Sequence, residues 1–176
     1  GISFLFVTHD QDEAMGLATR MGIMDKGCLQ QIGTPSELYE KPETEFVAEF
    51  LGEVNRLTGK IEQSTGNQIT VSLGAAGSIQ CVSEVRGPEN QNITCYVRPE
   101  KLFFDTGRPQ TEPTNILQGT LRGIHFFGSH SRYQLELSCG HMLTLSTQHR
   151  KTHSPQHSIG DSVRVLLAVS DVFTTT

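Results

Sequence analysis

The second half of the chain alternates apolar and polar residues in short segments, as half-buried β-strands do. Turn signals with glycine separate these segments, at residues 65–67, 87–88, 139–140 and 160–161. We find no convincing helical periodicity after Asn55, so this half is predicted to be a small β-barrel or sandwich. The apolar positions are Ile69/Val71/Leu73, Ile93/Cys95/Val97, Tyr133/Leu135/Leu137, Leu143/Leu145 and Val163/Val165/Leu167.

Two stretches of this half share the pattern N-x-L-x-G-x-[IL]. NRLTGKI begins at Asn55 and NILQGTL begins at Asn115, and the proline-containing TGRPQTEPTN precedes the second. Each is followed by alternating strands and turns in a similar order. The spacing predicts two repeats, about residues 55–105 and 115–176. A chance match between short apolar segments is the alternative.

The first 55 residues have the pattern of an α/β protein. Residues 3–8, SFLFVT, form an apolar run that predicts a strand buried on both faces of a parallel sheet. A helix is predicted after it, with one apolar stripe and an acidic first turn. His9 stands between the two, where open α/β sheets bind ligands. Asp10 is expected to cap the helix. The stripe consists of Ala14, Leu17, Ala18 and Met21.

A hairpin and two helices are predicted next. The segments GIMD and CLQQIG read as strands joined by a turn at Lys26-Gly27. Residues 34–37, TPSE, have the pattern of a capping box with proline at the first helical position. TEFVAEFLG predicts a further short helix that ends at Gly52.

Composition excludes some classes of protein. The 176 residues carry a formal net charge of −5, which disfavours nucleic acid or an anionic membrane surface as the main partner. No apolar run approaches the roughly 20 residues of a membrane-spanning helix, and no basic segment precedes the first run as in a signal peptide. The cysteines Cys28, Cys81, Cys95 and Cys139 form no CxxC pair, so reduced structural thiols are expected.

Other groups of residues receive structural interpretations. His149, His153 and His157 recur at four-residue steps, but Pro155 interrupts them, so a solvated loop is favoured over a metal site. No metal site is predicted. The aromatic residues of this half are expected in core or interface positions rather than as stacking platforms for nucleic acid. They are Tyr96, Tyr133 and the pair Phe126-Phe127 within IHFFGSHSRY, a predicted strand bend. Arg98-Pro99-Glu100 is predicted to form an inter-strand corner.

Four stretches resemble one family of proteins. VTHDQDEA is similar to the switch (H-loop) segment of ABC-transporter ATPases, and GIMDKGCLQQIGTPSELYEKP to the strand pair and helix that close their nucleotide-binding domain. FVAEFLGEVN resembles the exit from that domain, and YVRPEKL the VRPE signature of the transport-associated OB (TOBE) domain. The importers for polyamines, sulfate, iron and maltose are the most similar, and the spermidine/putrescine branch above all.

The resemblance implies a mostly β fold: a tandem OB-like β-barrel (TOBE) regulatory domain preceded by an α/β remnant of an ABC nucleotide-binding domain. The domains would be residues 1–54 and 55–176. In this family the histidine that matches His9 contacts the γ-phosphate of ATP. The parent protein would use ATP and Mg²⁺ and work as a homodimer of ATPase subunits. It would contact membrane permease subunits at the cytoplasmic face of the plasma membrane.

The sequence also departs from the family. It contains no G-x-x-x-x-G-K-[ST] loop, LSGGQ-type signature, Q-loop or Walker B aspartate. We therefore expect a C-terminal fragment that neither binds nor hydrolyses ATP by itself and needs no cofactor. Residues 1–52 are expected to pack on the barrel, associate with a second chain or rearrange. The alternative function is a non-enzymatic β-barrel domain that senses a small ligand or mediates dimerisation. A nucleic-acid binder is disfavoured by the acidic charge.

Overall fold

The computed structural model describes residues 3–83, 85, 87–107, 110–149 and 157–175. Within it the chain divides into two compact units, Gly1–Gly52 and Glu53–Thr175.

The first unit contains a hairpin and three short helices. Its elements are α1 (Gln11–Leu17), β1 (Met21–Asp25), β2 (Cys28–Gly33), α2 (Pro35–Glu40) and α3 (Glu45–Phe50). The predicted hairpin is confirmed: β1 pairs antiparallel with β2. Its turn residues Lys26 and Gly27 both have positive φ, 48° and 80°, as a tight two-residue turn requires. A small core of Ile23, Leu38, Val47 and Leu51 holds the unit together.

Helix α2 begins with the predicted capping box. The Glu37 backbone N–H donates to Thr34 Oγ1 (3.3 Å), and the Thr34 backbone N–H donates to Glu37 Oε2 (2.9 Å). The bond from the Thr34 backbone holds the pKa of Glu37 below its ordinary value. Thr44 caps α3 through a single bond, in which the Val47 backbone N–H donates to Thr44 Oγ1 (3.2 Å). At each helix a threonine side chain therefore satisfies one of the otherwise orphaned N–H groups.

The start of the chain differs from the prediction. Residues 3–8 form no strand, and Phe4, Leu5 and Val7 expose 88, 95 and 89% of their surface. A strand of a parallel sheet needs hydrogen-bonded neighbours, and the described residues provide none for this segment. Helix α1 is also shorter than predicted. It ends at Leu17, and Met21 begins β1, so the expected apolar stripe is cut short.

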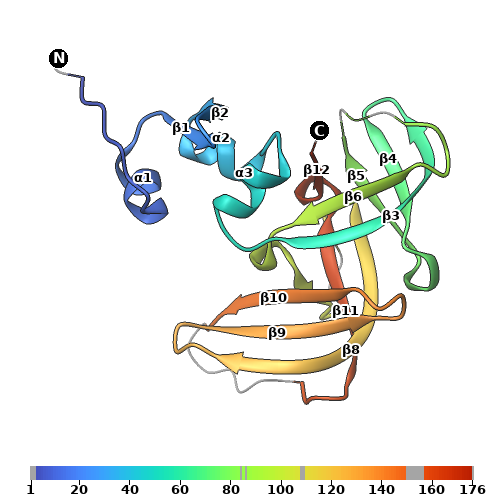
Figure 1. The fold of residues 1–176 in the computed structure, drawn as a ribbon. Coiled ribbons are helices and arrows are strands. Elements are labelled where there is room, and N and C mark those ends of the chain that lie inside the picture. The colour runs from blue at the N-terminus through green and yellow to red at the C-terminus, as the bar shows by residue number, and fades with distance from the viewer. Residues whose placement is uncertain (1–2, 84, 86, 108–109, 150–156, 176) are drawn as a thin grey trace. The chain divides into compact units, whose positions relative to one another are not determined.

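The second unit is built from two antiparallel five-stranded sheets (Figure 1), so the fold is mostly β as predicted. In hydrogen-bonded order the first sheet is β12-β6-β3-β4-β5 and the second is β10-β9-β8-β11-β7. Both orders are open at their ends, so the described strands form two open sheets, and no closed barrel is found among them. The elements are β3 (Asn55–Thr65), β4 (Gln68–Ser72), η1 (Gly74–Ala76), β5 (Ser78–Val82), β6 (Asn92–Val97), η2 (Pro99–Lys101), β7 (Phe103–Phe104), β8 (Thr114–Phe126), β9 (His130–Leu137), β10 (Met142–Gln148), β11 (Ser162–Ala168), η3 (Val169–Asp171) and β12 (Phe173–Thr174).

The two sheets have the same internal order, and they exchange their last strands. After β6 the chain passes through η2 into β7, which pairs with β11 of the second sheet. After β11 it passes through η3 into β12, which pairs with β6 of the first sheet. Each long strand, β3 and β8, also has a register shift, at Ile61/Gln63 and at Leu121/Gly123. Such bulges bend and twist a strand.

The asparagines of the repeated motif join the two sheets. Asn55 in β3 donates from Nδ2 to the Thr144 carbonyl of β10 (2.8 Å) and accepts from the Thr144 N–H (2.6 Å). Asn115 in β8 makes the same pair of bonds with Gln80 of β5, at 2.8 and 2.7 Å. Both asparagines are buried, with 5 and 7% exposed. Each side-chain amide therefore makes with a strand of the opposite sheet the pair of hydrogen bonds that a neighbouring strand would make.

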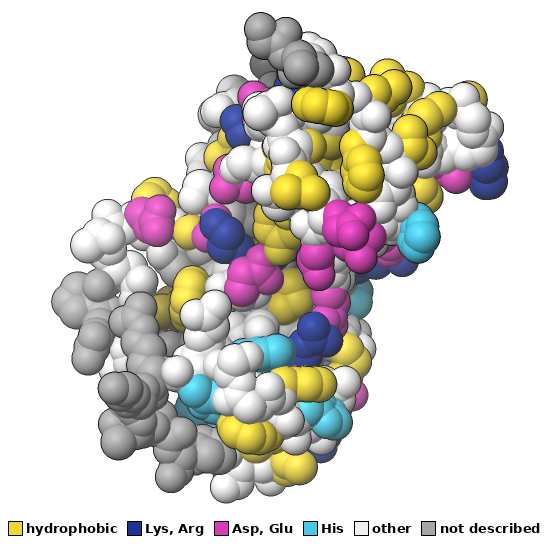
Figure 2. Space-filling model, turned by 90° about the vertical axis from the view of Figure 1, so that its left-hand side faces the viewer, with side chains coloured by type: hydrophobic (Ala, Val, Ile, Leu, Met, Phe, Trp, Pro, Cys, Tyr) yellow, Lys and Arg dark blue, Asp and Glu magenta, His cyan; other side chains and the backbone are white. Residues whose placement is uncertain are grey.

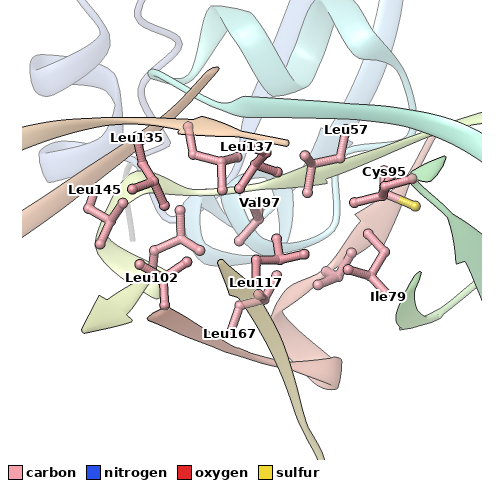
Figure 3. Packing of buried hydrophobic residues seen from close by; sticks show 14 of the residues in the cluster. Leu57, Ile79, Cys95, Val97, Leu102, Leu117, Leu135, Leu137, Leu145 and Leu167 are labelled. Atoms are coloured by element: carbon pink, nitrogen blue, oxygen red, sulfur yellow. The ribbon is translucent and has the colours of Figure 1, made fainter. Parts of the chain in front are cut away.

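The leucines and glycines of the motif build the core of this unit. Leu57 and Leu117 are fully buried in one cluster that takes residues from both sheets. Figure 3 shows these side chains gathered with those of Leu137 and Val97. A Cβ on Gly59 would collide with the Ser72 carbonyl, and one on Gly119 would lie 2.5 Å from the Glu136 carbonyl. Each glycine thus lets a neighbouring strand approach.

Replacing Asn115 by alanine is expected to lower the free energy of unfolding by about 1–3 kcal/mol, because the backbone N–H and C=O of Gln80 lose their part-buried hydrogen-bond partners. Urea unfolding followed by circular dichroism measures the change. Asn67→Ala, in the exposed turn between β3 and β4, is the control and should change stability by less than about 0.5 kcal/mol. Equal effects of the two substitutions would contradict this role.

Replacing Gly119 by alanine is expected to cost about 1–3 kcal/mol, since the clash is with a backbone carbonyl that cannot rotate away. The matched control is Thr120→Ala on the same strand, for which we expect a change within about 0.5 kcal/mol. Thermal unfolding of both variants gives the comparison. An unchanged melting temperature for Gly119→Ala would show that β8 and β9 are not held at this close approach.

Candidate functional site

His9 lies in an exposed bend just before α1. Thr8 Oγ1 accepts from the Asp10 backbone N–H (3.0 Å) and donates to Glu13 Oε2 (3.2 Å). Asp10 accepts from the Glu13 backbone N–H (3.0 Å), so it caps α1 as predicted. The residues on both sides of His9 are thus held locally, and none of the described residues bonds to its imidazole.

This arrangement leaves one imidazole able to hydrogen-bond a ligand. An imidazole both donates and accepts hydrogen bonds, and it gains a charge near neutral pH, so it suits a phosphate oxygen. A nucleotide site also needs a lysine and a glycine-rich loop to hold the phosphates. Within the described part of the first unit, no lysine is bonded to His9 and no glycine-rich loop is present. His9 can therefore supply one contact of a nucleotide site.

The sequence VRPEK forms the predicted corner between β6 and β7. Arg98 is buried, with 3% exposed, and its Nη1 donates to the Glu53 carbonyl (3.3 Å). Lys101, at the end of η2, forms an ion pair of 2.8 Å with Asp171, at the end of η3. Because η2 and η3 precede the two exchanged strands, this ion pair joins equivalent points of the two repeats.

A cavity of 720 Å³ opens beside η1, β8, β9 and the start of β11. Four of its polar side chains are paired with one another. Gln118 Nε2 donates to Ser162 Oγ (3.0 Å), and Arg122 Nε lies 2.6 Å from Glu136 Oε2. The cavity therefore offers hydrogen-bonding groups without a net charge.

Aromatic and histidine side chains form a surface cluster at the β8–β9 turn. Phe126 and Phe127 are 73 and 54% exposed, whereas Tyr96 and Tyr133 are buried as predicted.

Ring contacts connect the residues of this cluster. The His130 ring stacks on Phe127 with ring centres 5.1 Å apart, and the Arg132 guanidinium lies 5.4 Å from the centre of the Phe127 ring. Phe126 likewise contacts the ring of His149 at 5.2 Å. Figure 2 shows histidine and hydrophobic side chains gathered on one face. The Phe pair is therefore at the surface and not in the core.

Of the three histidines at four-residue steps, the structure describes His149 and His157, which have different neighbours. His149 Nε2 lies 2.9 Å from Ser131 Oγ, and the His157 ring contacts Phe104 at 4.4 Å. His153 and Pro155 lie outside the described residues. Across the ranges that the structure describes, no group of three His, Cys, Asp or Glu side chains could hold a metal ion.

All four cysteines are free thiols, in three different environments. Cys81 and Cys95 are fully buried with their sulfur atoms 3.8 Å apart. The hydrogen bond with Cys81 and burial raise the pKa of Cys95. Cys28 is exposed. Cys139 is half-buried and lies 3.3 Å from His141 Nδ1.

Sequence reasoning missed two of these features. It did not find the amide bonds of Asn55 and Asn115, although the repeated asparagine was the available signal. It also did not pair Cys139 with His141, although a turn between residues two apart can bring side chains together.

The described helices are all too short or too polar to cross a membrane.

Comparison with known proteins identifies both units. Residues 95–174 match the family model of the TOBE domain. The chain is 33% identical over 95% of its length to the spermidine/putrescine import ATP-binding protein PotA of Mesorhizobium japonicum. It is 32% identical over 94% of its length to PotA of Pseudomonas fluorescens and 31% over 97% to PotA of Treponema pallidum. It covers 44, 44 and 48% of these relatives, so it spans less than half of their length.

A solved structure supports the fold of the second unit. The cytoplasmic molybdate-binding protein ModG, in a molybdate-bound form, aligns with a TM-score of 0.58 over 69% of this chain and 96% of its own. The sequence identity is 16%, so the similarity concerns the fold alone. From the TOBE match and the relatives along nearly its whole length, the chain belongs to the family of ABC-importer ATP-binding subunits that carry a TOBE domain.

Proposed function

We propose that this chain forms the C-terminal and regulatory part of the ATP-binding subunit of a spermidine/putrescine importer. The observation that carries the proposal is the identity of 33% to a PotA protein along 95% of the chain. The complete subunit would couple ATP hydrolysis to solute uptake. It would act as a homodimer with membrane permease subunits, at the cytoplasmic face of the membrane.

His9 would act as the switch histidine of this ATPase. Its exposed imidazole, next to the capped start of α1, fits a hydrogen bond to the γ-phosphate of ATP. ATP bound with Mg²⁺ supplies the phosphoryl group that is transferred to water. The first unit offers one contact to that nucleotide, so the phosphate cradle and the metal ligands would come from residues outside this chain. We therefore propose that the chain alone does not hydrolyse ATP.

The exposed segment Phe4–Val7 supports the same proposal. Four consecutive apolar side chains in water are unfavourable, and such a patch commonly marks an interface. In the complete subunit this segment would be a buried strand of the nucleotide-binding sheet. The second unit would then contribute regulation and dimer contacts.

A second candidate function is the sensing of a small ligand by the second unit. The fold shared with the molybdate-binding protein ModG is the observation that favours it. On this hypothesis the chain would bind a small oxyanion or the transported solute without catalysing a reaction.

His9→Ala is expected to lower ATP turnover by about 100-fold or more, because one charge-stabilising contact to the transferred phosphate is lost. The test protein joins the upstream part of the Mesorhizobium PotA to this chain at Gly1. Asp10→Asn is the matched control, since asparagine also caps a helix, and it should keep turnover within about twofold. Normal turnover of His9→Ala in an active chimera would refute the role of His9.

Spermidine is expected to stimulate the ATPase of the chimera when it is reconstituted with the permease subunits and the binding protein of the Mesorhizobium importer. Calorimetry of residues 1–176 with ATP, spermidine and molybdate separates the two candidate functions. The transporter proposal expects no heat of ATP binding. Binding of molybdate or spermidine to the chain alone would favour the sensor instead.

A further inference from the structure

The turn between β9 and β10 holds a thiol against an imidazole. Cys139 and His141 flank Gly140, and the distance from Cys139 Sγ to His141 Nδ1 is 3.3 Å. Two backbone bonds close the turn: Gly140 N–H donates to the Leu137 carbonyl and Leu137 N–H donates to the His141 carbonyl, both at 2.9 Å. Gly140 has φ 88°, which glycine adopts without strain. The pair is therefore positioned by the hairpin.

The surroundings of this pair leave Cys139 partly exposed. Cys139 packs at the border of the main core and is half-buried, and His141 is half-buried as well. Its neighbours Ser138 and Gly140 line the 720 Å³ cavity. A reagent that reaches this cavity comes close to the turn.

The other three cysteines lack this combination. Cys81 and Cys95 are fully buried in the core, so a bulky reagent cannot reach them in the folded state. Cys28 is exposed, but among the described residues no imidazole lies against its sulfur atom. Cys139 alone of these thiols combines access with a neighbouring base, and the thiolate is the form that reacts.

We propose that Cys139 is a modification site that forms mixed disulfides with small-molecule disulfides of the glutathione type, with His141 as the proton acceptor. In the tautomer that carries its proton on Nε2, His141 accepts the thiol proton at Nδ1. Cys139 Sγ then attacks one sulfur of the small disulfide, whose S–S bond breaks. The leaving sulfur takes the electron pair and receives the proton from His141. One protein mixed disulfide and one small thiol result.

The modified residue would lie next to a strand that joins the two sheets. The turn leads directly into β10, whose Thr144 backbone holds Asn55 of the first sheet. A bulky group on Cys139 would therefore lie at the start of a strand that joins the two repeats.

The test compares the cysteines within one protein. The complete 176-residue chain is incubated with oxidised glutathione at pH 7, and peptide mass spectrometry follows glutathione addition at Cys139 and Cys28 over time. We expect Cys139 to react at least about tenfold faster than Cys28 in spite of its lower exposure, because the imidazole accepts the thiol proton. His141→Asn and His141→Gln should reduce the rate at Cys139 by a similar factor and leave Cys28 unchanged.

The controls make each result decisive. His125→Asn removes an exposed imidazole from the neighbouring strand β8 and should leave both rates unchanged. Circular dichroism verifies the fold of every variant, and the wild-type comparison needs no variant at all. The proposal is overturned if Cys139 reacts no faster than Cys28, or if both His141 variants keep the wild-type rate.

Discussion

The buried amides of Asn55 and Asn115 are the interaction on which the β unit depends. Each presents a donor and an acceptor to the backbone of the opposite sheet, to Thr144 and to Gln80. An isolated five-stranded sheet would leave such edge groups unpaired or open to solvent. Here a side chain completes the ladder, and this fixes the position of one sheet on the other. The shared core around Leu57 and Leu117 lies between the two sheets that these bonds join.

The exchanged strands β7 and β12 also hold the two sheets together. A two-residue strand such as β7 or β12 has little stability of its own. It is held because the 3-10 turn before it is fixed, and the ion pair between Lys101 and Asp171 ties these two turns together. Short exchanged edges also leave little open backbone for pairing with other chains. The repeated sequence thus yields a single unit and not two separate domains.

Much of this architecture could be predicted from sequence, for physical reasons that are local. The capping box at Thr34, the tight turn at Lys26-Gly27 and the alternation along β9 depend on residues close in sequence. The apolar run at residues 3–8 could not be assigned in this way, because a buried strand requires neighbours that the pattern itself does not contain. The order of the strands in the two sheets could not be predicted for a similar reason, since it is decided by contacts distant in sequence.

Among the candidate sites, too, features set by neighbouring residues could be predicted, whereas features set by distant contacts could not. Asp10 was predicted as a cap from its position before an acidic turn, and the structure confirms it. The role of His9 comes from family resemblance, because a single exposed imidazole has no local signature of its ligand. The Phe pair was expected in a core or interface position, and it lies exposed at the hairpin between β8 and β9. Hydrophobicity alone does not tell a buried residue from one at the tip of a strand.

The crossing of β7 and β12 also has a topological meaning. Since each repeat contributes a strand to the sheet of the other, neither repeat contains all of its own fold. Scission of the peptide chain between residues 105 and 114 would therefore leave two fragments interlocked by hydrogen bonds and a common core. The covalent connection joins the two repeats along the chain, whereas the interleaved strands hold them together in the folded unit.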